Sequence, residues 1–323
     1  MMKKLVLLAA VGLMCLAVVS EAAPKKIALV GRISWCPGSE GSTTDRDFDV
    51  MPHFSMDDEN LRRLVDSWGY YSVLMVDYVV QLMLNNGEVP FPPGDDADYS
   101  LYVNDGLYMA QPNFFQDNGY ELIWVTGTCW SSIAPPLKNV PIPVIQGEHV
   151  CLGSRSSKIG SIFMFDGEQS GDHNGVDKIV LTAEGKAHPI MADFPDEIAV
   201  FGDGPNGPPQ DPGQAWNGLH DVVANAAEGT KVLAVWADNP EQAAVAVIEK
   251  DAKLADGTPA PARRVMVFFN GGQVRPINEA ELPPVWVISG EYFTAEGKEL
   301  LRRCVRWALG EPAPAPVAKW QMK

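Results

Sequence analysis

The sequence predicts an α/β fold: a doubly wound, mainly parallel, flavodoxin-like sheet with helices on both faces. Four unbroken apolar runs, rich in β-branched and aromatic residues, are separated by stretches long enough for helices. This spacing is typical of parallel strands that are covered on both sides. After residue 155 the runs alternate more and the spacers shorten. We therefore expect an extended C-terminal half with some antiparallel strands.

The four parallel strands are expected in the N-terminal half. Their apolar runs are residues 24–30, 71–76, 120–127 and 142–147. Right-handed crossovers bring every loop that follows such a strand to the same edge of the sheet. In a flavodoxin-like order, 2-1-3-4, the first and third strands are neighbours. Polar residues that follow the strands are therefore expected to meet at one edge, where open α/β sheets bind ligands.

The first helix is predicted after Ser55. This residue is suited to cap the helix, with Asp58 three residues later as its reciprocal partner. Apolar residues recur with helical spacing over residues 61–68, and Gly69 ends the pattern. The sequence therefore predicts an amphipathic helix between the first two strands.

The C-terminal half is expected to hold shorter strands and one long helix. The candidate strands are residues 161–165, 178–181, 197–201, 231–236, 243–248 and 264–269. Residues 202–213 are rich in Gly and Pro and are predicted to form a surface loop, and Asp256-Gly257 is a hairpin signal. The helix begins near Thr294, buries Cys304 on its apolar face and stops at Gly310.

Composition limits the function. The 323 residues include 25 Lys+Arg and 41 Asp+Glu, a formal net charge of −16, which disfavours nucleic acid and anionic membranes as partners. With 46% hydrophobic residues the chain is apolar enough to fold around a core. It carries no glycine-rich nucleotide loop, serine-hydrolase elbow or zincin motif. We therefore expect no cofactor and no metal.

Residues 1–22 have the pattern of a secretory signal peptide, with a basic start, an apolar run and small residues before the cleavage point. The expectation is an exported protein, periplasmic or extracellular, without membrane insertion after signal cleavage. Residues 23–310 are expected to form a single α/β domain. Residues 311–323 are rich in Pro and Ala and are expected to be a disordered tail.

Several short motifs follow one another in a family order. They are KIALV at residues 26–30, YELIWV at 120–125 before a small-residue loop, PVIQGE at 143–148, AHPIMA at 187–192 and TAEGKEL at 294–300. In this order they resemble the class I glutamine-amidotransferase-like superfamily, in particular exported ThuA-like (trehalose-utilisation-type) bacterial proteins. The resemblance covers residues 25–310. It implies an amidotransferase-like domain and a carbohydrate-related ligand.

The resemblance also implies that the amidotransferase reaction is lost. Members that hydrolyse glutamine carry a cysteine nucleophile where Glu148 stands in this sequence. A carboxylate cannot replace a thiolate in that hydrolysis. The His-x-Glu pair expected near residues 285–293 is also missing, since only Glu291 is present there. Glutaminase activity is therefore not expected.

Glu148 and His149 are the predicted catalytic or ligand-anchoring residues, at the end of the fourth strand. Partial burial raises the pKa of a carboxyl group and suits it to acid/base chemistry. Alternatively, Glu148 accepts hydrogen bonds from backbone N–H groups and only stabilises the turn. Both interpretations stay open. Adjacent residues on a strand point to opposite sides, so only one of the two need face the edge.

Loop residues after the first and third strands are the predicted ligand contacts: Trp35, His53, Thr128, Cys129 and Trp130. Aromatic faces near a binding edge are suited to stack on sugar rings, and both tryptophans follow strands at the correct edge. The alternative is that the tryptophans pack as a cover over the sheet. His53 ends the first loop and is expected to overhang the same edge.

Cys36, Cys129 and Cys151 each follow a strand of the predicted parallel sheet. In an exported protein a disulfide is the usual state of two neighbouring thiols. A Cys36–Cys129 bridge is the first choice, with Cys129–Cys151 or no bridge as alternatives. A nucleophilic Cys129 is disfavoured by the acidic surroundings. A metal site formed by these cysteines with His149 is disfavoured because no zinc-ligand spacing occurs.

Two functions remain. In the first, the protein is an exported, catalytically degenerate amidotransferase-like module that binds a small polar, carbohydrate-related ligand at the edge near Glu148. In the second, it is a hydrolase or isomerase that acts on such a compound through Glu148 with His149 or His53. The first is preferred because no complete set of catalytic residues is visible.

Overall fold

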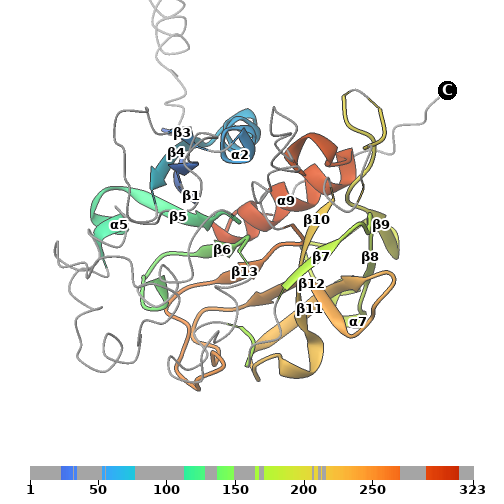
Figure 1. Cartoon of the computed structure of the whole chain (residues 1–323). Coiled ribbons are helices and arrows are strands. Elements are labelled where there is room, and N and C mark those ends of the chain that lie inside the picture. Colours follow the sequence, from blue (N-terminus) through green and yellow to red (C-terminus); the bar gives the residue numbers. More distant parts are fainter. Residues whose placement is uncertain are drawn as a thin grey trace, which may run out of the picture.

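One large mixed β-sheet forms the centre of the protein, with helices packed beside it (Figure 1). The computed structural model describes residues 23–31, 33–34, 53–54, 56–76, 113–127, 137–148, 164–166, 171–205, 207–209, 212, 216–269 and 289–312. The predicted α/β class is confirmed, with a sheet that is partly parallel and partly antiparallel. The predicted signal peptide and all but the first two residues of the predicted tail lie outside the described residues.

Five neighbouring strands form the parallel half of the sheet, in the order β4-β1-β5-β6-β13. Their bounds are β1 Lys26–Gly31, β4 Tyr71–Val76, β5 Tyr120–Val125, β6 Val144–Gln146 and β13 Arg264–Met266. Each neighbouring pair runs parallel. The first four strands have the predicted 2-1-3-4 order, and β13 adds a fifth strand from the C-terminal half.

The sheet continues from β13 as an antiparallel half, in the order β12-β11-β8-β9. The bounds are β8 Lys178–Leu181, β9 Glu197–Ala199, β11 Thr230–Trp236 and β12 Gln242–Ile248. The predicted hairpin signal lies in the connection between β12 and β13, where Gly257 has a φ of 81°. Of the predicted strand 161–165, the described part forms one bridge, between Phe165 and Ala226.

A pair of strands that the sequence pattern did not predict extends this sheet through a branch from β12. β7 (Gly171–Asn174) pairs antiparallel with β10 (Asn217–Val222), and the end of β10 pairs with β12. Both strands are mostly polar, with Asp172, His173 and Asp221 among their residues. Neither segment therefore has the apolar run or the regular alternation by which strands are recognised.

The described part of the chain contains four α-helices, of which two are long. They are α2 Met56–Ser67, α5 Phe114–Asp117, α7 Ala183–Lys186 and α9 Ala295–Ala308. The short elements are β2 Ile33–Ser34, β3 His53–Phe54 and the 3-10 turns η4 Val223–Asn225 and η5 Ser289–Tyr292. The helices α2 and α9 are the two that the sequence predicts. Among the described residues, no helix combines the length and hydrophobicity needed to cross a membrane.

Both faces of the parallel strands are buried. On one face, α2 and α9 pack against side chains such as Leu29 and Trp124. On the other, α5 and residues 137–142 pack against side chains such as Val30 and Val125. Both long described helices therefore share one face. The described residues do not show the predicted doubly wound arrangement, which requires long helices on both faces.

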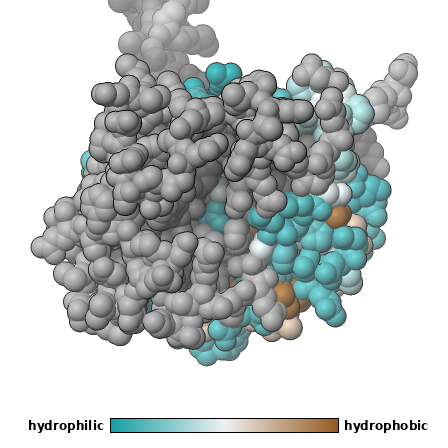
Figure 2. Space-filling view, viewed as in Figure 1, coloured by the Kyte–Doolittle hydropathy of each residue, from teal (hydrophilic) through white to brown (hydrophobic). Residues whose placement is uncertain are grey.

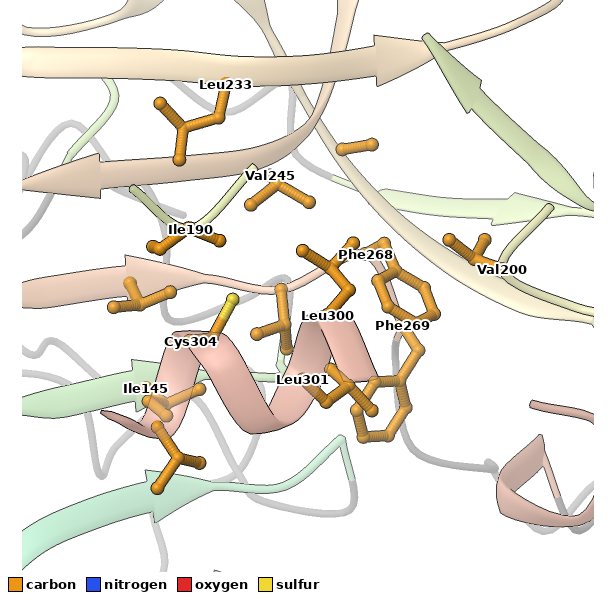
Figure 3. Packing of buried hydrophobic residues seen from close by; sticks show 14 of the residues in the cluster. Ile145, Ile190, Val200, Leu233, Val245, Phe268, Phe269, Leu300, Leu301 and Cys304 are labelled. Carbon is orange, nitrogen blue, oxygen red and sulfur yellow. The ribbon is translucent and has the colours of Figure 1, made fainter. Parts of the chain in front are cut away.

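Helix α9 is held close to the sheet at its first turn. Thr294 caps the helix, its hydroxyl accepting a hydrogen bond from the Gly297 N–H at 2.9 Å. A Cβ atom at Gly297 would lie 2.4 Å from the Val200 carbonyl oxygen, so glycine is required for this approach. Cys304 points into the core from the same helix (Figure 3), and burial raises the pKa of its thiol to about 12. Its predicted place in the core is confirmed.

Arg264 anchors the segment that leads into β6. Its guanidinium is fully buried and donates hydrogen bonds of 3.1 Å to backbone carbonyl oxygens. The acceptors are Lys138, Val140, Ile142, Ala262 and Arg263. Loss of hydration lowers the pKa of the guanidinium to about 9. One side chain thus fixes the backbone on which the end of β6 depends.

We expect Arg264→Met to lower the free energy of unfolding by about 3 kcal/mol, because several buried carbonyl oxygens lose their donor. Urea denaturation measures the change. Arg302→Met is the matched control, since Arg302 makes a partly exposed ion pair with Glu299 at 3.5 Å, and its loss should change stability by less than about 1 kcal/mol. Equal effects of the two substitutions would contradict the anchoring role.

Candidate functional site

The carboxyl ends of the parallel strands meet at one edge of the sheet. The Thr126 N–H donates to the Val30 carbonyl at 2.9 Å, and the Gly147 N–H donates to the Val125 carbonyl at 2.8 Å. These bonds continue the pairing of β1, β5 and β6 past their last residues. The residues that follow the three strands therefore lie side by side, where ligands of open α/β sheets bind.

Four buried polar side chains lie at this edge. They are Asp58 from α2, Thr126 after β5, and Gln146 and Glu148 at the end of β6, and each exposes 2% or less of its surface. We call these four residues the edge cluster. Asp58, Thr126 and Glu148 each have a partner within the protein. The cluster includes the predicted residue Glu148, and it adds three residues that were not predicted as site residues.

Gln146 is the member of the cluster that folding does not explain. Neither its Oε1 nor its Nε2 has a hydrogen-bond partner in the described part of the chain, and the side chain is fully buried. The strand register places it level with Val125 and Met266, which belong to the apolar core. A buried polar group without partners costs about 1 to 3 kcal/mol. An apolar residue would therefore stabilise the fold better at this position.

A second unpaired donor lies beside Gly147. The indole Nε1 of Trp124 is buried and has no acceptor among the residues that the structure describes. A Cβ atom at Gly147 would lie 3.4 Å from this nitrogen and 3.0 Å from the Val125 carbonyl oxygen. The glycine therefore leaves the indole N–H uncovered by a side chain. Trp124 is level with Ile145 on the face covered by α2 and α9, whereas Gln146 is level with Val125 on the other face. The two side chains therefore reach the strand ends from opposite faces of the sheet.

The carboxylate of Asp58 approaches the end of β1 because residue 31 is glycine. A Cβ atom at Gly31 would lie 2.7 Å from Asp58 Oδ2 and 3.0 Å from Oδ1. The first turn of α2 thus brings its acid to the sheet edge. Ser55, for which Asp58 was the predicted capping partner, lies outside the described residues.

Most of the predicted site residues lie outside the described part of the chain. These are Trp35, Cys36, Thr128, Cys129, Trp130, His149 and Cys151, so the predicted ligand contacts and disulfides stay predictions. His53 is described through its backbone, which pairs with Ser34 where β3 meets β2. The chain therefore returns His53 to the residues that follow β1. No group of three or more His, Cys, Asp or Glu side chains within the described ranges is arranged to hold a metal ion.

Two of the three unpredicted members, Gln146 and Asp58, were missed for different reasons. Gln146 carries a readable signal, because it is a polar amide that ends the otherwise apolar run 142–146. Asp58 carries none, since an acid in the first turn of a helix is usual and was interpreted as a cap. Only the packing of α2 against β1 brings it to the edge.

Comparisons with known proteins find similar structures at low sequence identity. No protein-family model and no curated protein matches the chain. The cytoplasmic protein STM3548 from Salmonella typhimurium is 10% identical, with a TM-score of 0.44 over 88% of this chain and 98% of its own. The cytoplasmic protein STM1381 from Salmonella typhimurium LT2 is 12% identical, with a TM-score of 0.39 over 88% and 97%. The protein SMU.1228c is 10% identical, with a TM-score of 0.36 over 88% and 99%.

These comparisons correct one prediction. Two of the similar structures are described as cytoplasmic proteins, which contradicts the export predicted from residues 1–22. Export, periplasmic or extracellular, is therefore withdrawn. All three TM-scores lie below 0.5, so the fold described above is argued from the chain's own strand pairing.

Replacement of Gly31 tests the position of Asp58. We expect Gly31→Ala to destabilise the protein by about 1 to 3 kcal/mol, because the new methyl group overlaps the Asp58 carboxylate. In a background of Asp58→Ala the same change should cost less than about 0.5 kcal/mol, since the two residues are coupled through this contact. Urea denaturation of the four proteins gives the coupling. Equal costs in both backgrounds would show that the two residues do not touch.

Proposed function

We propose that the protein is a catalytically degenerate, amidotransferase-like module that binds a small polar, carbohydrate-related ligand at the edge cluster. The order of the motifs supports the relationship and the ligand class by resemblance. The finer fold description, a doubly wound flavodoxin-like domain, is part of the same proposal. The strand order β4-β1-β5-β6 supports it.

The observation that carries the proposal is the unpartnered amide of Gln146. In the described part of the chain both of its polar atoms are buried without a hydrogen bond. Sequence changes that remove such a group stabilise a protein, and positions that keep one are commonly functional. A ligand hydroxyl both donates and accepts, so it can pair with either atom of the amide. Neighbouring hydroxyls on one sugar ring can pair with both.

The charge of the cluster supports a neutral, hydroxyl-rich ligand. Asp58 and Glu148 are both carboxylic acids, and no lysine or arginine belongs to the cluster. Carboxylates accept hydrogen bonds from hydroxyl groups, and they repel anionic ligands such as phosphates. The buried Trp124 N–H supplies a donor for a ring or hydroxyl oxygen. Polyols and sugars meet these requirements.

Binding is preferred over catalysis because Glu148 holds the position of the nucleophilic cysteine. The second candidate is a hydrolase or isomerase that acts through Glu148 with His149 or His53. The pairing of β3 with β2 favours His53 in this role, since it returns the histidine to the chain that follows β1. An imidazole near the cluster would provide the acid or base that the carboxylates lack.

Gln146→Met tests the proposal. The substitution removes the unpaired amide and keeps the side-chain size, so it should raise the free energy of unfolding by about 1 to 3 kcal/mol. The same variant should lose at least about tenfold in affinity for a sugar, because one good hydrogen bond to a buried group is worth about 1.4 kcal/mol or more. A panel of neutral monosaccharides, disaccharides and polyols is screened by thermal shift, and the best probe is measured by calorimetry.

Gln242→Met is the control for this experiment. Gln242 also carries a buried, unpartnered amide oxygen, but it lies at the start of β12 and outside the edge cluster. We expect it to gain stability without the tenfold loss of affinity that is expected for Gln146→Met. Binding that is unaffected by Gln146→Met, or an absence of binding to every member of the panel, rejects the proposed site.

Glu148→Gln separates the two candidate functions. We expect the variant to keep the fold and to bind the probe more weakly, because an amide is a poorer acceptor than a carboxylate. Any slow turnover of the probe by the wild type should persist in the variant. Circular dichroism and product analysis provide the two measurements. A compound that is consumed by the wild type and untouched by the variant would establish the hydrolase or isomerase instead.

A further inference from the structure

The strand β10 joins two parts of the molecule through a short junction. Residues 217–220 pair with β7, and residues 221–222 pair with Ala243 and Gln242 of β12. The strands β7, β10 and β12 lie next to one another in Figure 1, and the surface around β7 is mostly hydrophilic in Figure 2. The turn η4 follows directly. We call residues 221–227 and the facing residues 241–243 the β10–β12 junction.

The part of β10 before the junction is firmly anchored. The Leu219 N–H donates to the Phe268 carbonyl at 3.0 Å, and the Leu219 carbonyl accepts from the indole of Trp236 at 3.0 Å. On the paired strand β7, the His173 ring stacks on Trp236 with 4.6 Å between centroids, and its Nε2 lies 2.9 Å from Asp238 Oδ1. A Cβ atom at Gly218 would lie 2.5 Å from the Trp236 ring, so glycine permits this packing.

Two buried polar atoms of the junction lack a hydrogen-bond partner in the described part of the chain. Asp221 is fully buried, and its Oδ1 accepts a hydrogen bond from the Val222 N–H at 2.7 Å. Its Oδ2 has no partner within the described residues, and neither has the buried Oε1 of Gln242. Loss of hydration raises the pKa of the Asp221 carboxyl to about 7, and the Val222 N–H offsets only part of this effect.

No cation compensates a charge on Asp221 from the elements that form the junction. Strands β10 and β12, the turn η4 and residues 164–166 contain no lysine or arginine. The titratable groups on these elements and on the strands paired with them are His220 beside Asp221, Glu241 before β12, Asp166 against η4, Asp172 and His173 on β7, and Lys231 on β11. Asp221 Oδ2 has no partner among the described residues. An ionised Asp221 is therefore a buried negative charge without a paired cation.

We propose that Asp221 is a proton-controlled latch that keeps the β10–β12 junction closed when its carboxyl group is protonated and opens it locally when the group ionises. The sign follows from the raised pKa. A carboxyl group with a pKa of about 7 when closed and 3.8 when open favours the closed state fully below about pH 3.8, and this advantage is lost as the pH rises to about 7. The anchored part of β10 stays in place, so opening is confined to the junction.

The junction also holds residues 164–166, which follow Glu148 in the sequence. The Asp166 N–H donates to the Asn225 carbonyl at 2.7 Å, and the Ala227 N–H donates to the Met164 carbonyl at 2.8 Å. Opening of the junction therefore releases these residues. An effect of this release on ligand binding rests on the proposed function, whereas the latch itself does not.

Hydrogen exchange of the whole protein without ligand tests the latch. Protection factors, corrected for intrinsic exchange, are compared at about pH 5.5 and about pH 8.5 for the amides of Val223, Asp166 and Ala227. A group that titrates near pH 7 when closed and near pH 3.8 when open raises the opening constant about 30-fold over this range. We expect this loss of protection at the three amides and none at the Leu219 amide, which belongs to the anchored part.

Asp221→Asn is the decisive variant, because it keeps the shape and cannot ionise. We expect its junction amides to have the same protection at both pH values, within about twofold. Asp196→Asn, at an exposed acid, should behave as the wild type. In the wild type, the carboxyl carbon of Asp221 should titrate by NMR near pH 7, which supplies a test that needs no variant. A midpoint near 3.8, or equal protection of the wild type at both pH values, overturns the latch.

Ligand binding distinguishes the latch from the proposed function. If the latch exists and a sugar binds at the edge cluster, the probe found with the wild type should bind more weakly at about pH 8.5 than at about pH 5.5, and Asp221→Asn should remove the difference. The predicted loss of protection at high pH, without binding of any sugar, would reject the proposed function and support the latch. Sugar binding together with equal protection at both pH values would support the proposed function and reject the latch.

Discussion

Hydrogen bonds between the ends of parallel strands are the constraint on which the candidate site depends. They keep the carboxyl ends of β1, β5 and β6 level, through Thr126 and Gly147. Since both faces of these strands are buried, the strand ends are where their side chains can meet a ligand. Arg264 supports the same alignment from the other end of β6, because it holds the backbone that enters this strand. The edge cluster is a consequence of this alignment.

Polar groups in the interior fall into two kinds. Arg264 is buried and its Nε has no partner within the described ranges, but its two terminal nitrogens donate to five backbone carbonyl oxygens, so its role is structural. Gln146 and Asp221 are equally buried and have polar atoms without partners among the described residues. Interiors rarely keep such atoms unless another requirement retains them. For Gln146 we propose that this requirement is the binding of a ligand, and for Asp221 that it is the binding of a proton.

The accuracy of the sequence-based predictions follows the physical signal behind each element. The strands β1, β4 and β5 were predicted because strands buried on both faces need unbroken apolar runs, and α9 because it has a cap, an apolar face and a terminal glycine. The strands β7 and β10 were missed because both are polar and lack an apolar run. Pairing between β7 and β10, and between β10 and β12, stabilises them. The end of β5 was placed two residues too far, since Thr126 and Gly127 extend the chain without pairing as a strand.

The sequence by itself determined the parallel strands β1, β4, β5 and β6 and the sharing of one edge by their carboxyl ends. These properties are local, since they depend on composition and spacing along a few residues. Only the tertiary structure decided that Asp58 contacts the end of β1 and that Asp221 is buried where β10 pairs with β12. Burial and contact depend on residues distant in the chain, and an isolated acid in a sequence gives no sign of what will cover it.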